Sequence, residues 1–210
     1  MKKIVIATSN KHKVSEISAK IQPFFDEILS LADFPEIGEI VEDGNTIEEN
    51  SFIKSRASFD HTKIASVADD TILEVDALNG APGLYTARYA GENATYEENM
   101  TKLLKKLDGI EDKFRTARFR TIISFVDGVN DFHVEGTIEG KILQSRVGSN
   151  GFGYDPVFFS TEFNLSLAQL VEQEITSISL YKFGSWFGSS TVLAIIEILT
   201  ISSLVEKQSW

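Results

Sequence analysis

Residues 3–22 read KIVIATSNKHKVSEISAKIQ, a β-rich run that leads directly into a helical one. Lys3–Thr8 predicts a buried strand. Ser9 and Asn10 are both good N-cap residues, and apolar side chains recur at helical spacing after them, so we expect a helix from about Lys11 to about Gln22. A strand followed by a helix is the unit from which α/β proteins are built.

Strand and helix patterns alternate along most of the remaining sequence. The further strands expected are Ile28–Leu31, Ala65–Ala68, Leu73–Ala77, Arg115–Val126, Asp131–Ile138 and Tyr154–Phe159. The further helices expected are Thr46–Phe59, Tyr96–Leu107 and Ser166–Glu174. This order predicts an α/β protein with a central mixed β-sheet flanked by helices.

The helix expected at Thr46–Phe59 has a clear start and a predicted inner face. Thr46 is a plausible N-cap with Glu49 three residues later, which is the spacing of a capping box. The side chains expected to face the core are the apolar ones, Ile47, Phe52, Ile53 and Ala57.

Composition excludes several classes of protein. The chain has 210 residues, no cysteine and 42% hydrophobic residues, which is typical of one globular domain or of one domain with two lobes. Without cysteine there is no disulfide scaffold, thiolate metal site or cysteine nucleophile. No apolar run reaches membrane-spanning length, and the N-terminal run is too short for a signal peptide, so we expect a cytoplasmic protein that does not bind membranes.

The net charge of −11 is concentrated in one segment. Residues 26–76 contain fourteen acidic and three basic side chains. This excess argues against nucleic-acid binding, which requires a basic surface. The acidic segment is either a solvated face or a site for a hard divalent cation, and composition alone favours the solvated face.

The loop between the first strand and the first helix is the first candidate site. A helix N-terminus presents unpaired N–H groups and a partial positive charge, which suit phosphate oxygens. The small polar and basic side chains at this position are Thr8, Ser9, Asn10, Lys11, His12 and Lys13. The competing interpretation is an ordinary capped helix with exposed lysines.

A second candidate site consists of Glu42 and the pair Asp69-Asp70. Open α/β sheets bind ligands at the C-terminal ends of their strands, where we expect the two aspartates to lie. Adjacent residues of a strand point to opposite faces, so one aspartate can face a cleft. Carboxylates of this kind could hold Mg²⁺. The alternative is a surface turn at Glu42 and an Asx-turn at the aspartates.

A third candidate site is Gly151–Pro156. Its glycines allow tight backbone passage, and Phe152 and Tyr154 offer ring faces on which a base could stack. The alternative is a turn whose aromatic rings belong to the core.

Five motifs follow one another in a fixed order. They are Ala7–Lys13, Glu42–Thr46 with Glu49-Asn50, Ala68–Thr71, Gly83–Gly91 and Gly151–Pro156. Together they resemble the inosine triphosphate pyrophosphatase family, from Met1 to about Ser179. The resemblance implies one domain over residues 1–210 with two lobes around a nucleotide-binding cleft. It also implies a homodimer and a Mg²⁺-dependent hydrolase that splits ITP, dITP or XTP into the monophosphate and pyrophosphate.

The resemblance assigns roles to the three candidate sites. It implies that Thr8–Lys13 hold the triphosphate and that Glu42 and Asp70 ligate Mg²⁺. Asp70 would also orient or deprotonate the attacking water. Substrate contacts are implied for Thr71 and for the base pocket, which would be lined by Phe152, Gly153, Tyr154 and Asp155.

The sequence departs from the family pattern at several positions. Ile72 stands where the family has glycine, so a tight turn that relied on glycine would have to change. Ile175, Leu180 and Tyr181 replace a lysine, a histidine and an arginine of the family. Each lost charge-assisted contact costs about 1.5–3 kcal/mol. A nucleotide-binding homologue with little turnover therefore remains an alternative, as does hydrolysis of a different nucleotide.

Overall fold

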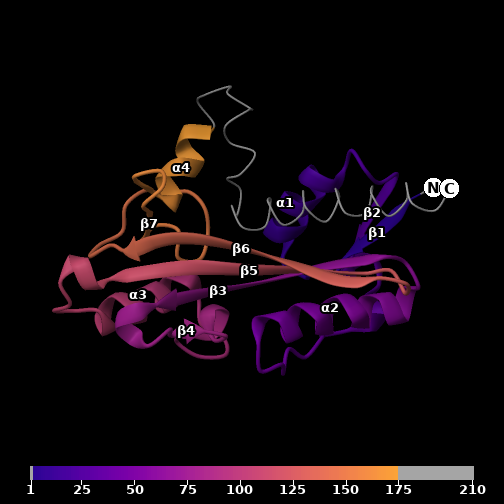
Figure 1. Cartoon of the computed structure of the whole chain (residues 1–210), viewed down its shortest axis with the longest axis horizontal. Coiled ribbons are helices and arrows are strands. Elements are labelled where there is room, and N and C mark those ends of the chain that lie inside the picture. Colours follow the sequence, from indigo (N-terminus) through magenta and orange to yellow (C-terminus); the bar gives the residue numbers. More distant parts are fainter. Residues whose placement is uncertain (1, 175–210) are drawn as a thin grey trace. The chain divides into compact units, whose positions relative to one another are not determined.

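The computed structural model describes residues 2–174 and is an α/β protein with a central mixed sheet (Figure 1). Its strands are β1 (Lys3–Ile6), β2 (Glu27–Ser30), β3 (Ser66–Val75), β4 (Pro82–Gly83), β5 (Thr116–Val126), β6 (Asp131–Ile142), β7 (Phe158–Ser160) and β8 (Leu165–Ser166). Its α-helices are α1 (Lys11–Ile21), α2 (Ile47–Thr62), α3 (Tyr96–Lys106) and α4 (Leu167–Glu174). The predicted architecture is confirmed, and β4 and β8 are the short strands that the sequence did not indicate.

The sheet is mixed because the strands at one end are parallel and those at the other end are antiparallel. The strand order is β2-β1-β3-β5-β6-β7-β8, and β4 pairs with β3. β1 is parallel to β2 and to β3, whereas β3–β4, β6–β7 and β7–β8 are antiparallel. The parallel part therefore carries the strand–helix connection of the first candidate site, and the second candidate site lies beside it, at Glu42 before α2 and at Asp69-Asp70 within β3.

The chain divides into two compact units. Of the described residues, unit 1 contains 2–70 and 121–136, and unit 2 contains 71–120 and 137–174. The strands β3, β5 and β6 each contribute one part to each unit. The first two candidate sites lie in unit 1, apart from Thr71, which belongs with the third site to unit 2.

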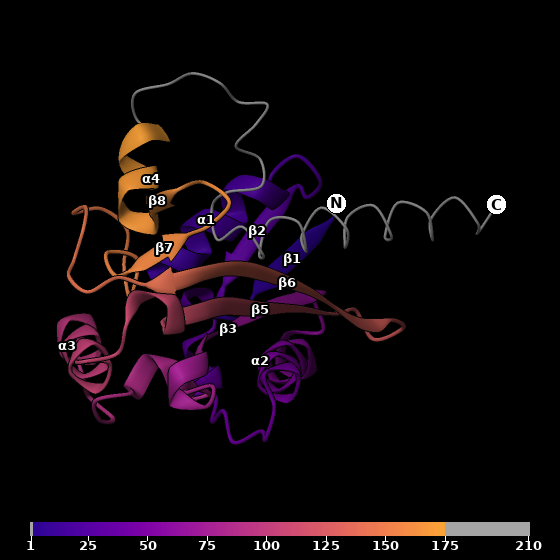
Figure 2. The same cartoon turned by 60° about the vertical axis from the view of Figure 1, so that its left-hand side comes forward.

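In unit 1, α1 and α2 cover opposite faces of the sheet (Figures 1 and 2). Ile17 and Ile21 of α1 pack on one face. Their buried partners there are Ile4, Ile6, Val67, Ile123 and Phe125. This apolar contact fixes α1, and with it the loop that precedes the helix, against β1 and β3.

The predicted inner face of α2 is wrong except at Ile47. Phe52, Ile53 and Ala57 are only partly buried. The other buried side chains of the helix are all polar, namely Asn50, Ser51, Lys54, Ser55 and Ser58. Small hydroxyl side chains let the helix approach the sheet closely, and there the Ser51 Oγ donates to the Ser124 Oγ over 2.9 Å. Phe52 instead packs at the flank, edge-on to the His133 ring.

The end predicted for the third strand is also wrong. We expected Ala65–Ala68 to end before the aspartates, but β3 continues to Val75, and Asp69 and Asp70 lie within it. The strand pairs with β1 at Ser66 and Val67 and with β4 at Leu73 and Glu74, and β5 is its other neighbour in the sheet. Each aspartate also forms an ion pair with a lysine, Asp69 with Lys13 and Asp70 with Lys54.

Unit 2 has its own apolar core, built from β3, β5, β6, α3 and the turn before β7. Its fully buried members include Leu73, Leu103, Ala117, Ile142 and Phe158. The strand expected at Tyr154–Phe159 begins only at Phe158, because the backbone of Tyr154 forms a turn that accepts hydrogen bonds from the N–H groups of Val157 and Phe158. In the described residues no helix is long and apolar enough to cross a membrane.

Candidate functional site in unit 1

The loop after β1 is ordered by its own polar side chains. The Asn10 N–H donates to the Thr8 Oγ1 over 3.2 Å, and the Asn10 Oδ1 accepts the His12 N–H over 3.0 Å, so Asn10 caps α1 as predicted. Ser9, Lys11 and His12 are exposed. The N-terminal end of α1 therefore lies beside the exposed Lys11 side chain, which is an arrangement that suits phosphate.

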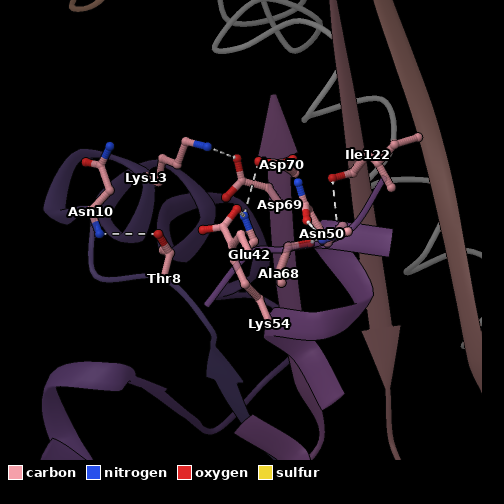
Figure 3. A network of polar contacts seen from close by, with 12 residues as sticks. Thr8, Asn10, Lys13, Glu42, Asn50, Lys54, Ala68, Asp69, Asp70 and Ile122 are labelled. Atoms are coloured by element: carbon pink, nitrogen blue, oxygen red, sulfur yellow. Dashed lines mark hydrogen bonds and ion pairs between the residues drawn. The ribbon is translucent and has the colours of Figure 1, made fainter. Parts of the chain in front are cut away.

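Lys13 turns from this helix toward β3. Its Nζ lies 2.6 Å from the Asp69 Oδ2 (Figure 3), and Asp69 is 3% exposed. Burial lowers the pKa of Lys13, but the charge and hydrogen bond of Asp69, with smaller contributions from Asp70 and Glu42, raise it above its ordinary value overall. Lys13 is therefore a cation at every physiological pH. It lies at the edge of an acidic cluster that consists of Glu42, Asp69 and Asp70.

Asp70 points to the opposite face, where a second lysine lies between two carboxylates. The Lys54 Nζ of α2 is 3.2 Å from the Asp70 Oδ1 and 3.0 Å from the Glu42 Oε2 (Figure 3). Burial raises the pKa of Asp70 above its ordinary value, Glu42 adds to this rise, and Lys54 and Lys13 only partly offset it. The carboxylate of Asp70 is thus more basic than that of an exposed aspartate.

The acidic cluster has the donor set that a hard divalent cation prefers. Glu42 and Asp70 converge on one positively charged atom, the Lys54 Nζ. In the described part of the chain, the Asp69 Oδ1 is buried without a hydrogen-bond partner. Among residues 2–174 no three His, Cys, Asp or Glu side chains gather to hold an ion by themselves. Mg²⁺ fits this arrangement, because it is commonly held by one or two carboxylates and completed by water and substrate phosphates.

The remaining predicted residues lie in unit 2. Thr71 and Ile72 follow Asp70 within β3, and Ile72 is buried in extended backbone, so no glycine-dependent turn occurs at this position. Phe152 is partly exposed and tilted against the Tyr96 ring, with ring centroids 6.2 Å apart. The Asp155 side chain stabilises the turn at residues 152–155, because its Oδ2 accepts the Phe152 N–H over 2.8 Å.

Tyr154 is placed differently from its neighbours. It is 4% exposed within the core of unit 2, and its hydroxyl donates to the Thr86 carbonyl over 3.0 Å. Burial raises the pKa of Tyr154. Of the two rings in this motif, Phe152 is therefore the accessible one. Gly153 beside it has φ +60°, and no atom lies within 4 Å of the position that a Cβ would occupy there.

Sequence reasoning missed Lys54, which contacts Glu42 and Asp70, and assigned no role to Asn50, which contacts the adjacent loop at Gly44. Lys54 is only 7% exposed, and Asn50, one helical turn earlier, accepts the Gly44 N–H. The available signal was the polar series at positions 50, 51, 54, 55 and 58, which recurs at helical spacing. An inner face of apolar residues, as the pattern of α2 predicts, has no place for a buried lysine. Ile175, Leu180 and Tyr181 lie outside the described residues.

Comparison with known proteins places the chain in a family. Residues 4–182 match the Ham1 family. The chain is 48% identical over 177 residues to a dITP/XTP pyrophosphatase of Thermoanaerobacter pseudethanolicus, which covers 84% of this chain and 89% of that protein. It is 44% identical over 173 residues to a protein of the same name from Vibrio parahaemolyticus, covering 81% and 86%.

Solved structures agree with this assignment. The Staphylococcus aureus Ham1 protein superposes with a TM-score of 0.79 at 34% identity, covering 96% of this chain and 98% of that one. A Ham1 protein from Coxiella burnetii gives 0.81 at 30% identity, covering 97% and 99%. The predicted class of enzyme, a nucleoside-triphosphate pyrophosphatase, is confirmed. The chain belongs to the Ham1 family.

Proposed function

We propose that this chain hydrolyses the non-canonical purine nucleoside triphosphates ITP, dITP and XTP to the monophosphate and pyrophosphate. The oxygen of a water molecule bonds to the α-phosphorus, and the bond from that phosphorus to the bridging oxygen breaks, so that pyrophosphate leaves. The names of the relatives from Thermoanaerobacter pseudethanolicus and Vibrio parahaemolyticus support this substrate class.

The observation that carries the proposal is the pairing of two carboxylates with two lysines from different helices. Lys13 and the N-terminus of α1 supply positive charge for phosphate oxygens. Asp70 supplies a carboxylate whose raised pKa favours accepting a proton from water. Both the positive charge and the proton acceptor are needed when water attacks a phosphoanhydride that already carries negative charge.

Glu42 and Asp70 are the residues that would hold Mg²⁺ in this proposal. When bound, the ion offsets negative charge on the phosphates and lowers the pKa of bound water. Lys54 lies between the same two carboxylates and keeps their charges compensated. Once Glu42 and Asp70 bind the ion, the Lys54 ammonium group would be near enough to contact phosphate oxygens.

For the base we propose the motif of unit 2. Phe152 would stack on the purine, with Gly153 leaving room beside it. Asp155 would hold the turn in shape, and Tyr154 would support it from the core. Thr71 would contact substrate from β3. The homodimer and the cytoplasmic location expected from the sequence remain predictions, and gel filtration tests the first.

A second candidate function is nucleotide binding with little or no turnover. The sequence observation that favours it is the loss of lysine, histidine and arginine at Ile175, Leu180 and Tyr181. The two functions share the phosphate loop and the acidic cluster, so they differ in turnover and not in the ability to bind a nucleotide.

The decisive experiment measures pyrophosphate released from ITP, dITP, XTP, ATP and GTP, with Mg²⁺ and with EDTA in its place. The proposed function predicts release that requires the metal. If no nucleotide is hydrolysed but ITP still binds in equilibrium dialysis, the second candidate function holds. A metal-independent release would contradict the roles of Glu42 and Asp70.

A further inference from the structure

Glu42 lies in a segment that has no regular structure to hold it. Residues 38–46 follow a short 3₁₀ turn and precede α2, and within them the structure describes neither helix nor strand. A metal ligand in such a segment needs other restraints. A mobile carboxylate loses conformational entropy when it binds an ion, and this loss weakens the affinity for the ion.

The restraints come from two side chains in the first turns of α2. The Asn50 Oδ1 accepts the Gly44 N–H over 2.8 Å, and the Glu49 Oε2 accepts the Asn45 N–H over 2.6 Å. Glu49 was expected to cap its own helix by bonding to Thr46, but its carboxylate bonds one residue earlier, although its N–H does donate to the Thr46 Oγ1. The loop is therefore bound to the helix at two consecutive amides.

Asn50 is the better fixed of the two side chains. It is 6% exposed, whereas Glu49 is exposed, and it lies one helical turn before Lys54, whose Nζ contacts Glu42. Both the backbone of the loop and the tip of Glu42 are thus held by neighbouring turns of one helix. Figure 3 draws Asn50 in the same network of polar contacts as Glu42 and Lys54.

The sequence of the loop matches this contact. A Cβ on Gly44 would lie 2.7 Å from the Asn50 Oδ1 and 2.7 Å from the Glu49 Cβ. Neither atom is the far end of a long flexible side chain, so the loop would have to move away. Gly44 is required here for close approach.

We infer that Asn50 is a positioning residue for the metal-binding carboxylate of Glu42, acting through the Gly44 N–H. The inference rests on the proposed function only in taking Glu42 as a metal ligand. Outer-shell groups that orient a ligand typically change metal affinity by about 10- to 100-fold when they are removed. The same loss is expected here, without a change in the ligands themselves.

The test compares Asn50→Leu, which has a similar volume but no acceptor, with Asn50→Asp, which keeps an oxygen at the same place. Binding of Mn²⁺ alone, without nucleotide, is followed by the loss of the free-ion signal in electron paramagnetic resonance. Hydrogen exchange of peptides covering residues 42–46 reports directly whether the Gly44 amide is protected. Neither measurement depends on turnover.

The expected result is a Mn²⁺ affinity about 10- to 100-fold weaker in Asn50→Leu, with faster exchange at residues 42–46. Asn50→Asp should restore both toward the unaltered chain. The matched control is Asn99→Leu, since Asn99 is a buried amide of unit 2 that accepts the Ala90 N–H over 2.7 Å. That control should leave Mn²⁺ binding unchanged.

Gly44→Ala tests the same contact from the loop side and should weaken Mn²⁺ binding even if Asn50→Leu fails to fold. Unchanged Mn²⁺ affinity in the folded variants, or an equal loss in Asn99→Leu, would overturn the inference, as would a chain that takes up no Mn²⁺. If the unaltered chain binds Mn²⁺ and the variants bind the ion more weakly, the inference stands even if the unaltered chain releases no pyrophosphate. In that case only the proposed function fails.

Discussion

Asp69 and Asp70 are consecutive residues of β3, yet they form ion pairs with lysines of different helices on opposite faces of the sheet. The Asp69 Oδ2 lies 2.6 Å from the Lys13 Nζ of α1, and the Asp70 Oδ1 lies 3.2 Å from the Lys54 Nζ of α2. The alternation of side chains along a strand produces this division. As a result, buried Asp69 forms a close ion pair with Lys13, whereas Asp70 shares the Lys54 ammonium group with Glu42.

Replacing Asp70 by asparagine should abolish Mg²⁺-dependent hydrolysis and leave the fold intact. The substitution removes one of two proposed metal ligands and the proposed base, and loss of a general base alone typically costs about 10²–10⁴-fold in rate. The measurement is pyrophosphate release from ITP at saturating Mg²⁺. Asp43→Asn is the matched control, since Asp43 is an exposed carboxylate next to Glu42 and should retain full activity. Unchanged turnover in Asp70→Asn would remove Asp70 from the mechanism.

The same variant should be more stable than the unaltered chain at pH 7. Burial raises the pKa of Asp70 above its ordinary value of 3.8, so the folded state favours the protonated carboxyl, which asparagine imitates. The penalty for ionised Asp70 is fully present above the raised pKa and disappears as pH falls toward 3.8. The stability advantage of the variant should therefore shrink between neutral pH and about pH 4.

Urea denaturation of both chains across this pH range is the measurement. Lys54 keeps Glu42 as a partner in the variant, which limits the loss from its broken ion pair. An advantage that grew on acidification, or a variant less stable at pH 7, would show that the ion pair with Lys54 outweighs burial.

Lys13→Ala should weaken binding of ITP more than binding of IMP, because the additional phosphates carry the charge that this lysine would meet. The lysine remains protonated throughout, since Asp69 holds the pKa of Lys13 above its ordinary value against the effect of burial. Isothermal titration in the presence of Ca²⁺ separates binding from turnover. An equal loss for both ligands would place Lys13 outside the phosphate site.

Lys13→Ala should also lower the stability of the fold, and this effect can be measured separately from nucleotide binding. Removing Lys13 leaves Asp69 buried without its ion-pair partner, and breaking a buried pair on one side typically costs about 3–5 kcal/mol. The double variant Lys13→Ala with Asp69→Asn should recover much of that stability. If binding of ITP stays weak in the double variant, the lost affinity belongs to Lys13 itself.

Any activity of the unaltered chain should discriminate poorly between ITP and ATP. Selectivity needs donors aimed at the purine 6-oxygen, so that an amino group there leaves polar groups unpaired. By resemblance those donors would stand at positions 180 and 181, where the chain has Leu180 and Tyr181. The measurement is the ratio of kcat/KM for the two nucleotides, and a strong preference for ITP would contradict the prediction.

Restoring the family residues provides the second half of this test. The variant carrying Ile175→Lys, Leu180→His and Tyr181→Arg should hydrolyse ITP faster than the unaltered chain. A folded variant with unchanged turnover would show that these positions do not contribute to the site.

Much of the site was predictable because it depends on local sequence. Asn10 caps α1 and Thr46 caps α2 as expected, since capping requires only a short polar side chain at the right offset from the helix. The opposite directions of Asp69 and Asp70 follow from the period of a strand, whatever surrounds it. The end of the strand did not follow from local sequence, because β3 extends to Val75 and its last part, at Leu73 and Glu74, pairs with β4.

The partners of these residues were decided by tertiary structure. The sequence by itself determined the α/β order, the capped loop after β1 and the presence of three candidate carboxylates, Glu42, Asp69 and Asp70. It did not reveal that α2 packs its serine face on the sheet, which buries Lys54 and brings its ammonium group between Glu42 and Asp70. Which face of a helix is buried depends on what the opposing surface can accommodate, and that surface is assembled from β3 and β5, strands far apart in the chain.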